Sequence, residues 1–176
     1  MTALFWLMML VATSAPGTPL IPGCAPDSLR VPILVYHNVT PLPPDASRAL
    51  REFNVSPDQF EWQMAHLRAQ GIGVVSLDAL IDARLGRGRI DGPAVVIAFD
   101  DGWLGQYQYA FPVLRRFGYS ATFFNFTNPI GRNARWMTWD QLRELCDVWT
   151  LRSVHVTEDS ARFRKIVEPR VRRGGA

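Results

Sequence analysis

Short apolar runs alternate along this chain with segments whose apolar residues recur at helical spacing, and this alternation predicts the fold. Strands are expected over 31–36, 74–75, 94–99 and 121–126, and helices over 57–70, 77–85, 106–117 and from 139 onward. The run 94–99 is apolar at every position, which is typical of a strand in a parallel sheet that helices cover. The order βαβαβαβα therefore predicts an α/β fold class.

Capping residues mark where the expected helices begin. Ser56 precedes Pro57, which suits the first helical position. Thr138 and Gln141 form a capping box before the last helix. By contrast, residues 40–51 are rich in Pro and Ala and show no apolar period, so we expect a loop there.

Composition and charge narrow the class of protein. The 176 residues are 48% hydrophobic and 20% charged, which is within the globular range, and one domain is the default for this length. The formal net charge of +3 is concentrated at the C-terminal end, because residues 148–176 carry seven basic and three acidic side chains. The rest of the chain is nearly neutral and lacks the basic face that nucleic acid requires. We therefore expect no nucleic-acid partner.

Residues 1–28 are expected to form a leader and linker. Residues 4–12 are a short apolar run followed by small and turn-forming residues, as in a secretory signal peptide, although no Lys or Arg precedes the run. The run is too short to span a bilayer as a stable helix. Ile21 to Cys24 is similar to a lipoprotein box, so one alternative is membrane association through the leader or a lipidated Cys24. The other is that Cys24 and Cys146 are two unpaired thiols. We expect an exported protein, extracellular or associated with a bacterial cell envelope.

Two adjacent carboxylates follow the most apolar strand. Asp100 and Asp101 stand at its C-terminal end, where functional residues collect in parallel sheets and barrels. An Asp-Gly pair after a strand is also an ordinary turn. Two neighbouring carboxylates repel each other unless a cation or a shared proton relieves the repulsion, so the pair favours a metal or acid–base site. His37 closes the first strand at the same edge, either as a substrate contact or as a histidine packed at a strand end.

Aromatic residues follow the carboxylates closely. Trp103, Tyr107 and Tyr109 form either a surface on which a sugar ring stacks or part of the core. Trp136 and Trp139 leave the same two interpretations open.

Several segments, in order, resemble one enzyme family. The segment AVVIAFDDGW, followed one helix later by YSATFF, resembles the first motif of the NodB-homology polysaccharide deacetylases, carbohydrate esterase family 4. The opening VPILVYHNV and the stretch FNVSPDQFEWQMAHLRAQGIGVVSLDAL are similar to exported members of that family that act on surface polysaccharides. The resemblance runs from Val31 to Asp147. Residues 29–147 are therefore expected to be the N-terminal part of a NodB-homology domain.

The resemblance implies a distorted (β/α) barrel, here incomplete, with one divalent metal ion, often zinc, at its mouth. It implies Asp100 as the general base and Asp101 as a metal ligand. The implied reaction is hydrolysis of N-acetyl groups on an amino-sugar polymer, which releases acetate and leaves a free amine. The metal would polarise the acetamide carbonyl and acidify a bound water, whose proton the base would take. Poly-N-acetylglucosamine, peptidoglycan and chitin-like polymers all fit as the N-acetylated polysaccharide.

The sequence departs from the family pattern after Asp147. The family completes its metal site with two histidines in an H-x-x-x-H segment, after a strand that reads close to EIGS. Here His155 lies near the first position and Asp159 at the second, but basic residues crowd the region and no apolar strand is expected there. His155 is kept as a candidate metal ligand. Later family motifs are not found before Ala176, so we expect the chain as given to be inactive.

Residues 148–176 form an Arg-rich tail, for which a shifted reading frame is one explanation. A permitted codon choice for Trp149 to Val154, together with the start of the His155 codon, reads, shifted by two bases, as Asp-Leu-Glu-Ile-Gly-Ser, which is the missing family strand. Under this hypothesis the tail is not under selection. Besides a crippled deacetylase, the sequence leaves open a non-catalytic carbohydrate-binding barrel and an unstable fragment with exposed strand edges.

Overall fold

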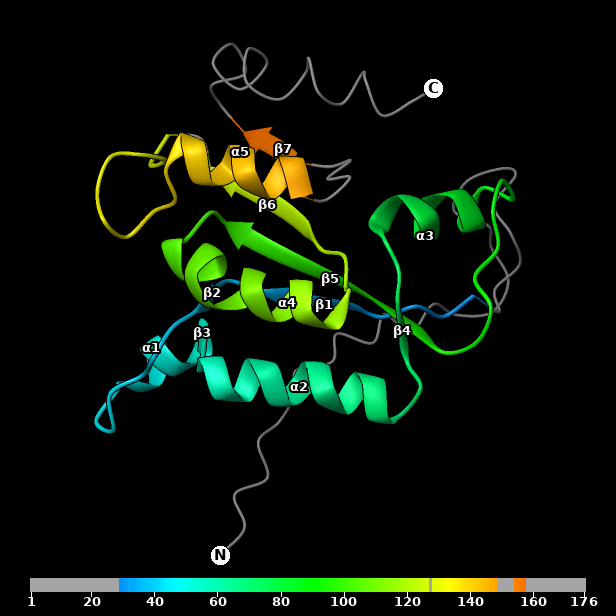
Figure 1. Ribbon diagram of the computed structural model, residues 1–176, viewed down its shortest axis with the longest axis horizontal. Coiled ribbons are helices and arrows are strands. Elements are labelled where there is room, and N and C mark those ends of the chain that lie inside the picture. Colours follow the sequence, from blue (N-terminus) through cyan, green and yellow to red (C-terminus); the bar gives the residue numbers. More distant parts are fainter. Residues whose placement is uncertain (1–28, 127, 149–153, 158–176) are drawn as a thin grey trace, which may run out of the picture.

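The computed structural model describes residues 29–126, 128–148 and 154–157 (Figure 1). Within them, the main sheet has the order β1-β5-β6-β7, with β4 also paired to β5, and every pair is parallel. The strands are β1 (Ile33–Tyr36), β4 (Gly73–Val74), β5 (Ala94–Asp101), β6 (Thr122–Phe126) and β7 (Val154–Thr157). The predicted parallel sheet and the α/β fold class are confirmed.

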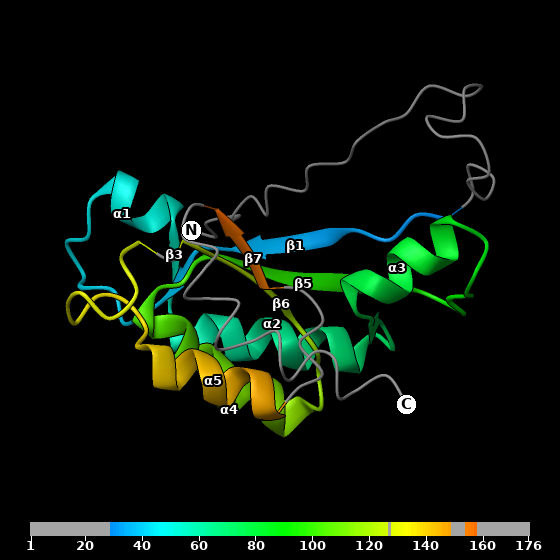
Figure 2. The same cartoon turned by 90° about the horizontal axis from the view of Figure 1, so that it is seen from above.

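Helices cover one face of this sheet. They are α2 (Pro57–Ala69), η1 (Gln106–Ala110, a π-helix), α4 (Phe111–Phe117) and α5 (Trp139–Val148). Helix α3 (Leu77–Arg84) lies apart from them (Figure 1). Figure 2 shows α2, α4 and α5 together on one side of β1, β5 and β6. In the part of the chain that the structure describes, no helix has the length and apolar character needed to cross a bilayer.

The core lies between these helices and the sheet. Phe99 of β5 stacks on Phe123 of β6, with ring centroids 4.9 Å apart, and Phe60 of α2 packs beside Phe99 at 5.9 Å. All three side chains are fully buried. Burial of a side chain of this size stabilises the fold by about 1.5–3 kcal/mol. The core therefore fixes the position of the C-terminal half of β5, which ends with Asp100 and Asp101.

The caps that the sequence predicts are formed. Ser56 Oγ accepts a hydrogen bond from the Gln59 N–H at 3.2 Å at the start of α2. Before α5, Thr138 Oγ1 accepts from the Gln141 N–H at 3.2 Å, and Gln141 Oε1 accepts from the Thr138 N–H at 2.8 Å. The second pair is a complete capping box. Local hydrogen bonds thus set where these helices begin.

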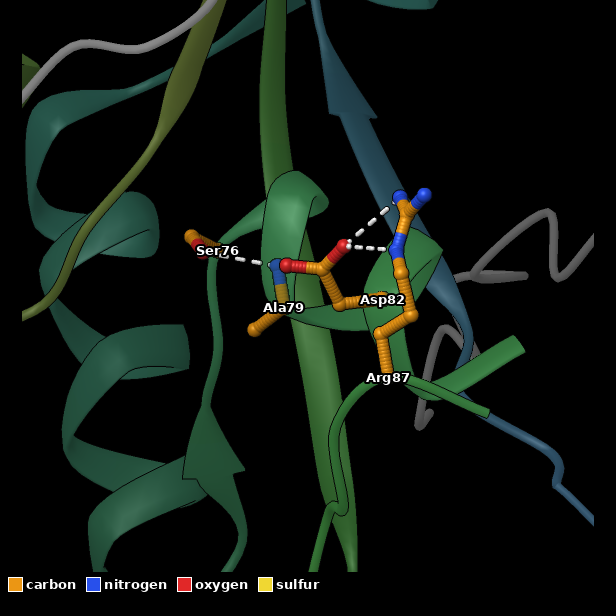
Figure 3. A network of polar contacts seen from close by, with 4 residues as sticks. All are labelled: Ser76, Ala79, Asp82 and Arg87. Carbon is orange, nitrogen blue, oxygen red and sulfur yellow. Dashed lines mark hydrogen bonds and ion pairs between the residues drawn. The ribbon is translucent and has the colours of Figure 1, made fainter. Parts of the chain in front are cut away.

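A polar network organises both ends of α3 (Figure 3). Ser76 Oγ accepts from the Ala79 N–H at 3.1 Å, and Arg87 donates from Nε and Nη2 to Asp82 Oδ1 at 3.1 and 2.8 Å. Both charged side chains are largely exposed, and exposed ion pairs contribute little stability. The network shapes the turn that leads to the start of β5, at the end of that strand remote from the carboxylates (Figure 1).

The prediction of a loop over 40–51 is wrong in part. The structure forms helix α1 (Arg48–Glu52) between two short strands, β2 (Asn38–Val39) and β3 (Asn54–Val55), which pair in parallel. Ser47 caps α1, and Arg48 pairs with Glu52 across one turn at 2.8 Å. A helix of five residues with no buried side chain shows no apolar period, so the pattern could not reveal it.

The helix expected over 106–117 is two elements, the π-helix η1 and then α4. In η1 the Phe111 N–H donates to the Gln106 carbonyl, five residues earlier. Pro112 has no N–H to donate, so an unbroken α-helical hydrogen-bond pattern cannot run through it. Wide turns of this kind are frequent at functional sites, and this one follows the carboxylate pair directly.

Strand β1 is less buried than the sequence predicts. Tyr36 is buried, but Ile33 and Val35 on the other face are 47% and 53% exposed. In the described sheet β1 lies at the edge and pairs only with β5. The exposed face of β1, which carries Ile33 and Val35, corresponds to the side that faces the interior of a closed barrel.

A strand forms where the sequence analysis expects none. β7 pairs in parallel with β6, and the backbone of His155 lies opposite that of Phe124. Its sequence, VHVT, alternates Val with polar residues, and β-branched residues favour pairing with an existing strand. The leader with Cys24, and the rest of the tail including Asp159, lie outside the described residues. Predictions about them stay predictions.

Candidate active site

The C-terminal ends of β5 and β6 meet at one edge of the sheet. Asp100 pairs with Phe124, and Asp101 pairs with Asn125. Since side chains alternate along a strand, Asp100 lies on the face opposite to the one that Phe99 shares with the helices. In a (β/α) barrel this opposite face is the interior, and active sites lie at its C-terminal edge.

The turn after Asp101 has an uncommon backbone. Asp101 is the only non-glycine residue with positive φ among the described residues, at 76°, and Gly102 follows at 88°. A Cβ on Gly102 would lie 2.8 Å from Asn125 Oδ1 and 2.9 Å from Ile130 Cδ1. Glycine is therefore required for both its conformation and its size. A left-handed Asp costs about 1–2 kcal/mol, which the surrounding contacts must offset.

Trp103 holds the Asp101 carboxylate. The indole Nε1–H donates to Asp101 Oδ2 at 3.1 Å. The Trp103 ring stacks on Trp136, with centroids 4.1 Å apart and planes 22° apart. Backbone bonds tie the same turn to this segment, from Met137 N–H to Gly102 O at 3.1 Å and from Leu104 N–H to the Arg135 carbonyl at 2.9 Å. These contacts together hold the turn at Asp101 and Gly102 against residues 135–137.

Asp100 stands in a mixed electrostatic environment. Burial raises the pKa of the Asp100 carboxyl above its ordinary value, the positive charge of nearby His37 lowers it, and the charge of Asp101 raises it again. The net direction is upward. A carboxylate with a raised pKa accepts a proton more readily, as a general base requires.

Gln106 connects the ends of β1 and β5 and was missed by the sequence analysis. Its side chain is fully buried, and Nε2 donates to the His37 carbonyl at 2.6 Å and to the Asp100 carbonyl at 2.5 Å. The preceding Gly105 has no room for a side chain, because a Cβ would lie 2.1 Å from the Val39 carbonyl oxygen. Gln106 therefore fixes the spacing of the two strand ends that carry His37 and Asp100. A polar residue at a helix start is too common a pattern to reveal this role.

A cleft of about 730 Å³ opens beside the carboxylates. His37 and Asp101 both line it, which confirms that they lie at the same edge of the sheet. The His37 ring contacts Phe53 edge-on at 5.3 Å, and it is only partly buried. His37 is therefore accessible from the cleft, and its contact with a substrate stays a prediction.

The structure separates the five aromatic residues that the sequence left ambiguous. Trp103 and Tyr109 line the cleft. Tyr107 lies elsewhere, because its hydroxyl bonds to Glu144, which raises the pKa of Tyr107, and its ring stacks on Phe111. The remaining two have packing roles: Trp136 stacks on Trp103, and Trp139 packs against the core.

Comparison with known proteins adds independent information. The sequence model of the family described as Polysaccharide deacetylase matches residues 87–148, which include the carboxylate pair. The Bacillus subtilis (strain 168) protein named "Putative polysaccharide deacetylase YxkH" is 29% identical over 116 residues, which cover 66% of this chain. IcaB from Ammonifex degensii, a solved structure, is 31% identical with a TM-score of 0.60 over 70% of this chain. The chain is therefore similar to polysaccharide deacetylases over about two thirds of its length.

Another solved structure is similar to this chain. The de-N-acetylase from Aggregatibacter actinomycetemcomitans is 26% identical, with a TM-score of 0.58 over 71% of this chain. The predicted incomplete barrel is also borne out. The described strands form an open sheet, and the chain spans 38% of YxkH, 51% of IcaB and 52% of the Aggregatibacter protein.

The described residues do not supply a complete set of metal ligands. No group of three or more His, Cys, Asp or Glu side chains that could bind a metal ion is found among them. A catalytic zinc ion is ordinarily bound by three protein ligands. Asp101 fits as one of them, with Oδ2 already bonded to Trp103. His155 is placed by its backbone alone, in β7, two strands from β5.

Proposed function

We propose that the chain provides the carboxylate pair of an enzyme that hydrolyses N-acetyl groups on an amino-sugar polymer. The proposal rests on one observation above all. Asp100 and Asp101 stand at the C-terminal edge of a parallel sheet, and Asp101 and His37 line a cleft of about 730 Å³ there. The match to the family model and a relative that is named a de-N-acetylase support the proposal.

Asp100 is the proposed general base. It takes a proton from a water molecule as the water oxygen attacks the acetamide carbonyl carbon, after which the C–N bond breaks and the amine nitrogen gains a proton. The products are acetate and a free amine. The raised pKa of Asp100 brings the carboxyl closer to neutral pH, where proton transfer is most effective. Gln106 keeps the backbones of Asp100 and His37 at a fixed spacing, so that His37 can contact the substrate beside the base.

Asp101 is the proposed ligand of one divalent cation, zinc by the resemblance of the motif. Such an ion supplies an electrophile for the acetamide carbonyl when bound. The hydrogen bond from Trp103 fixes one carboxylate oxygen of Asp101 and restricts its rotation. Because the described residues do not complete a metal site, we assign no reaction step to the ion.

A second candidate is carbohydrate binding without catalysis. Two observations favour it: the described residues do not complete a metal site, and the cleft beside Asp101 is present. Export to the cell envelope or beyond, with membrane association through the leader or a lipidated Cys24, is proposed for either function from the N-terminal sequence alone.

Acetate release from N-acetylglucosamine oligomers tests the proposal. A frame-corrected, full-length protein is expected to release acetate, to lose activity with a chelator and to regain it with zinc. Asp100→Asn should lower turnover by at least about 10²-fold, the lower range for a general base. Asp45→Asn in an exposed loop is the matched control and should leave turnover unchanged. Unchanged turnover in Asp100→Asn would show that the base is assigned wrongly, and acetate release absent from the unsubstituted protein would favour the binding function.

A further inference from the structure

Two apolar walls face the cleft beside Asp101. One wall comes from the segment after β5, with Trp103 and Tyr109. The other comes from α1 and the residue that follows it, with Leu50 and Phe53. Leu50 and Phe53 are 41% and 57% exposed, so both side chains present apolar surface at the cleft. Apolar surface gathered in a concave site is typical of ligand binding.

Polar groups lie among these apolar side chains. Asn38, Thr40, Asn54 and Gln108 line the same cleft, and Asn38 Oδ1 is buried without a hydrogen-bond partner. The side chains of Asp101 and Arg135 introduce one negative and one positive charge. A ligand that matches this lining is uncharged overall, has apolar faces and carries hydroxyl or amide groups at its edges. A pyranose ring has this chemistry, since its C–H faces pack on aromatic rings and its hydroxyls point outward.

Trp103 is held in place before any ligand binds. Its N–H is bonded to Asp101, and Trp136 stacks against its ring at 4.1 Å. Phe53, which is 57% exposed, contacts the His37 ring edge-on at 5.3 Å. Rings that are already ordered lose little conformational entropy on binding. The bond to Asp101 also sets Trp103 next to the carboxylate pair.

We propose that Trp103 and Phe53 form a sugar-ring subsite, in which a pyranose of the polymer packs on these aromatic side chains next to Asp101. The inference rests on the proposed function, because it assigns the residues that bind the substrate of that same site. It adds that binding depends on aromatic surface, and therefore persists without metal and without turnover.

Binding of N-acetylglucosamine trimer to the metal-free 176-residue chain tests the subsite. Calorimetry and ligand-observed NMR are the measurements. Phe53→Ala should weaken binding about tenfold, the equivalent of one aromatic contact of about 1.4 kcal/mol. Phe53→Tyr should retain binding within about twofold. Trp103→Phe, which keeps an aromatic ring but loses the bond to Asp101, should weaken binding less than Trp103→Ala.

Trp62→Ala is the matched control. Trp62 is 63% exposed on α2, stacks on His66 and does not line the cleft, so its loss should leave trimer binding unchanged. Circular dichroism of each variant checks that the fold is retained. Folded Phe53→Ala and Trp103→Ala proteins that bind the trimer like the unsubstituted chain would overturn the subsite. So would an unsubstituted chain that binds no trimer at millimolar concentrations.

A second probe separates this inference from the proposed function. Cellotriose has pyranose rings but no acetamido groups. If both trimers bind and the binding depends on Trp103 and Phe53, but the full-length protein releases no acetate, the subsite is supported and the deacetylase proposal is contradicted. If Phe53→Ala and Trp103→Ala change neither acetate release nor trimer binding, the deacetylase proposal is supported and the subsite is contradicted.

Discussion

Gln106 shows how one buried side chain organises the candidate site. Its two hydrogen bonds link carbonyl groups on separate strands, at residues 37 and 100, with no exposure to solvent. The geometry of the site at the ends of β1 and β5 therefore depends on a residue outside both strands. Its Oε1 has no hydrogen-bond partner among the described residues, so the amide is anchored through its nitrogen.

Gln106→Leu is expected to lower the free energy of unfolding by about 2 kcal/mol. The substitution leaves two buried carbonyl groups without this donor, and each such loss costs about 1–3 kcal/mol, offset in part by the apolar replacement. Urea denaturation measures the change. The exposed Gln108→Leu, one half-turn later, is the control and should change stability by less than about 0.5 kcal/mol. Equal stability of the two variants would show that the bridge contributes nothing.

Asp100 is expected to be a destabilising residue at neutral pH. Its folded-state pKa is raised by burial and by Asp101, so ionisation costs more in the folded than in the unfolded chain. This penalty is absent below the unfolded pKa of about 3.9, and it grows as pH rises until it is complete above the folded pKa. Asp100→Asn should therefore raise the melting temperature at pH 7, and this gain should shrink as pH falls toward 4. Thermal melts at both pH values, with Asp45→Asn as control, measure this. A gain that is the same at both values would contradict the assigned cause.

At the scale of elements, the turn between β5 and η1 determines where the carboxylates lie. Asp101 and Gly102 both take positive φ, and the segment that ends at Met137 bonds to the Gly102 carbonyl. The π-helix then starts with Gly105 packed against the β2 backbone. The side chains of Asn125 and Ile130 beside Gly102, and the Val39 backbone beside Gly105, leave this turn no space for added side chains.

Gly102→Ala is expected to destabilise the fold more than Gly86→Ala. Both positions have positive φ, at 88° and 70°, so each substitution carries a backbone cost of about 1–2 kcal/mol. Only at Gly102 would the Cβ contact neighbours at 2.8 and 2.9 Å, whereas nothing lies within 4 Å of it at Gly86. Overpacking adds about 1–3 kcal/mol at Gly102. Urea denaturation of both variants tests this, and equal losses would mean that Asn125 and Ile130 move aside freely.

At the scale of the whole molecule, the described sheet is open on the side that a barrel would enclose. Val35 of β1 and Phe126 of β6 are 53% and 50% exposed on that side, while the helix-covered side is packed. The chain also spans only about half the length of IcaB. Among the described residues, no group of three or more His, Cys, Asp or Glu side chains could hold a metal ion.

The 176-residue chain is therefore expected to bind zinc weakly and to release no measurable acetate. One carboxylate does not hold a zinc ion that ordinarily needs three protein ligands. Zinc titration by calorimetry and an acetate assay on the purified chain measure both properties. Stoichiometric binding tighter than about micromolar, lost in His155→Ala, would instead show that β7 and the tail supply a working site.

The sequence by itself determined the elements and the chemistry. The all-apolar run of β5, the caps of α2 and α5 and the carboxylates at the strand end follow from local rules of periodicity, hydrogen bonding and charge, and the structure places them as expected. The short α1 and its flanking strands were not predicted, because elements this short have no period to recognise. β7 was missed since its pairing depends on the free edge of β6, which is a property of the sheet.

Only the tertiary structure decided how those residues act together. Gln106 meets His37 from 69 positions away, and Trp103 meets Trp136 across the mouth of the sheet. Such contacts depend on strand register and on turns with positive φ, neither of which is encoded by a local pattern. The sequence therefore identified candidate side chains for the proposed chemistry. Tertiary packing decided which of them share a cleft, since long-range contacts arise only when distant segments fold against one another.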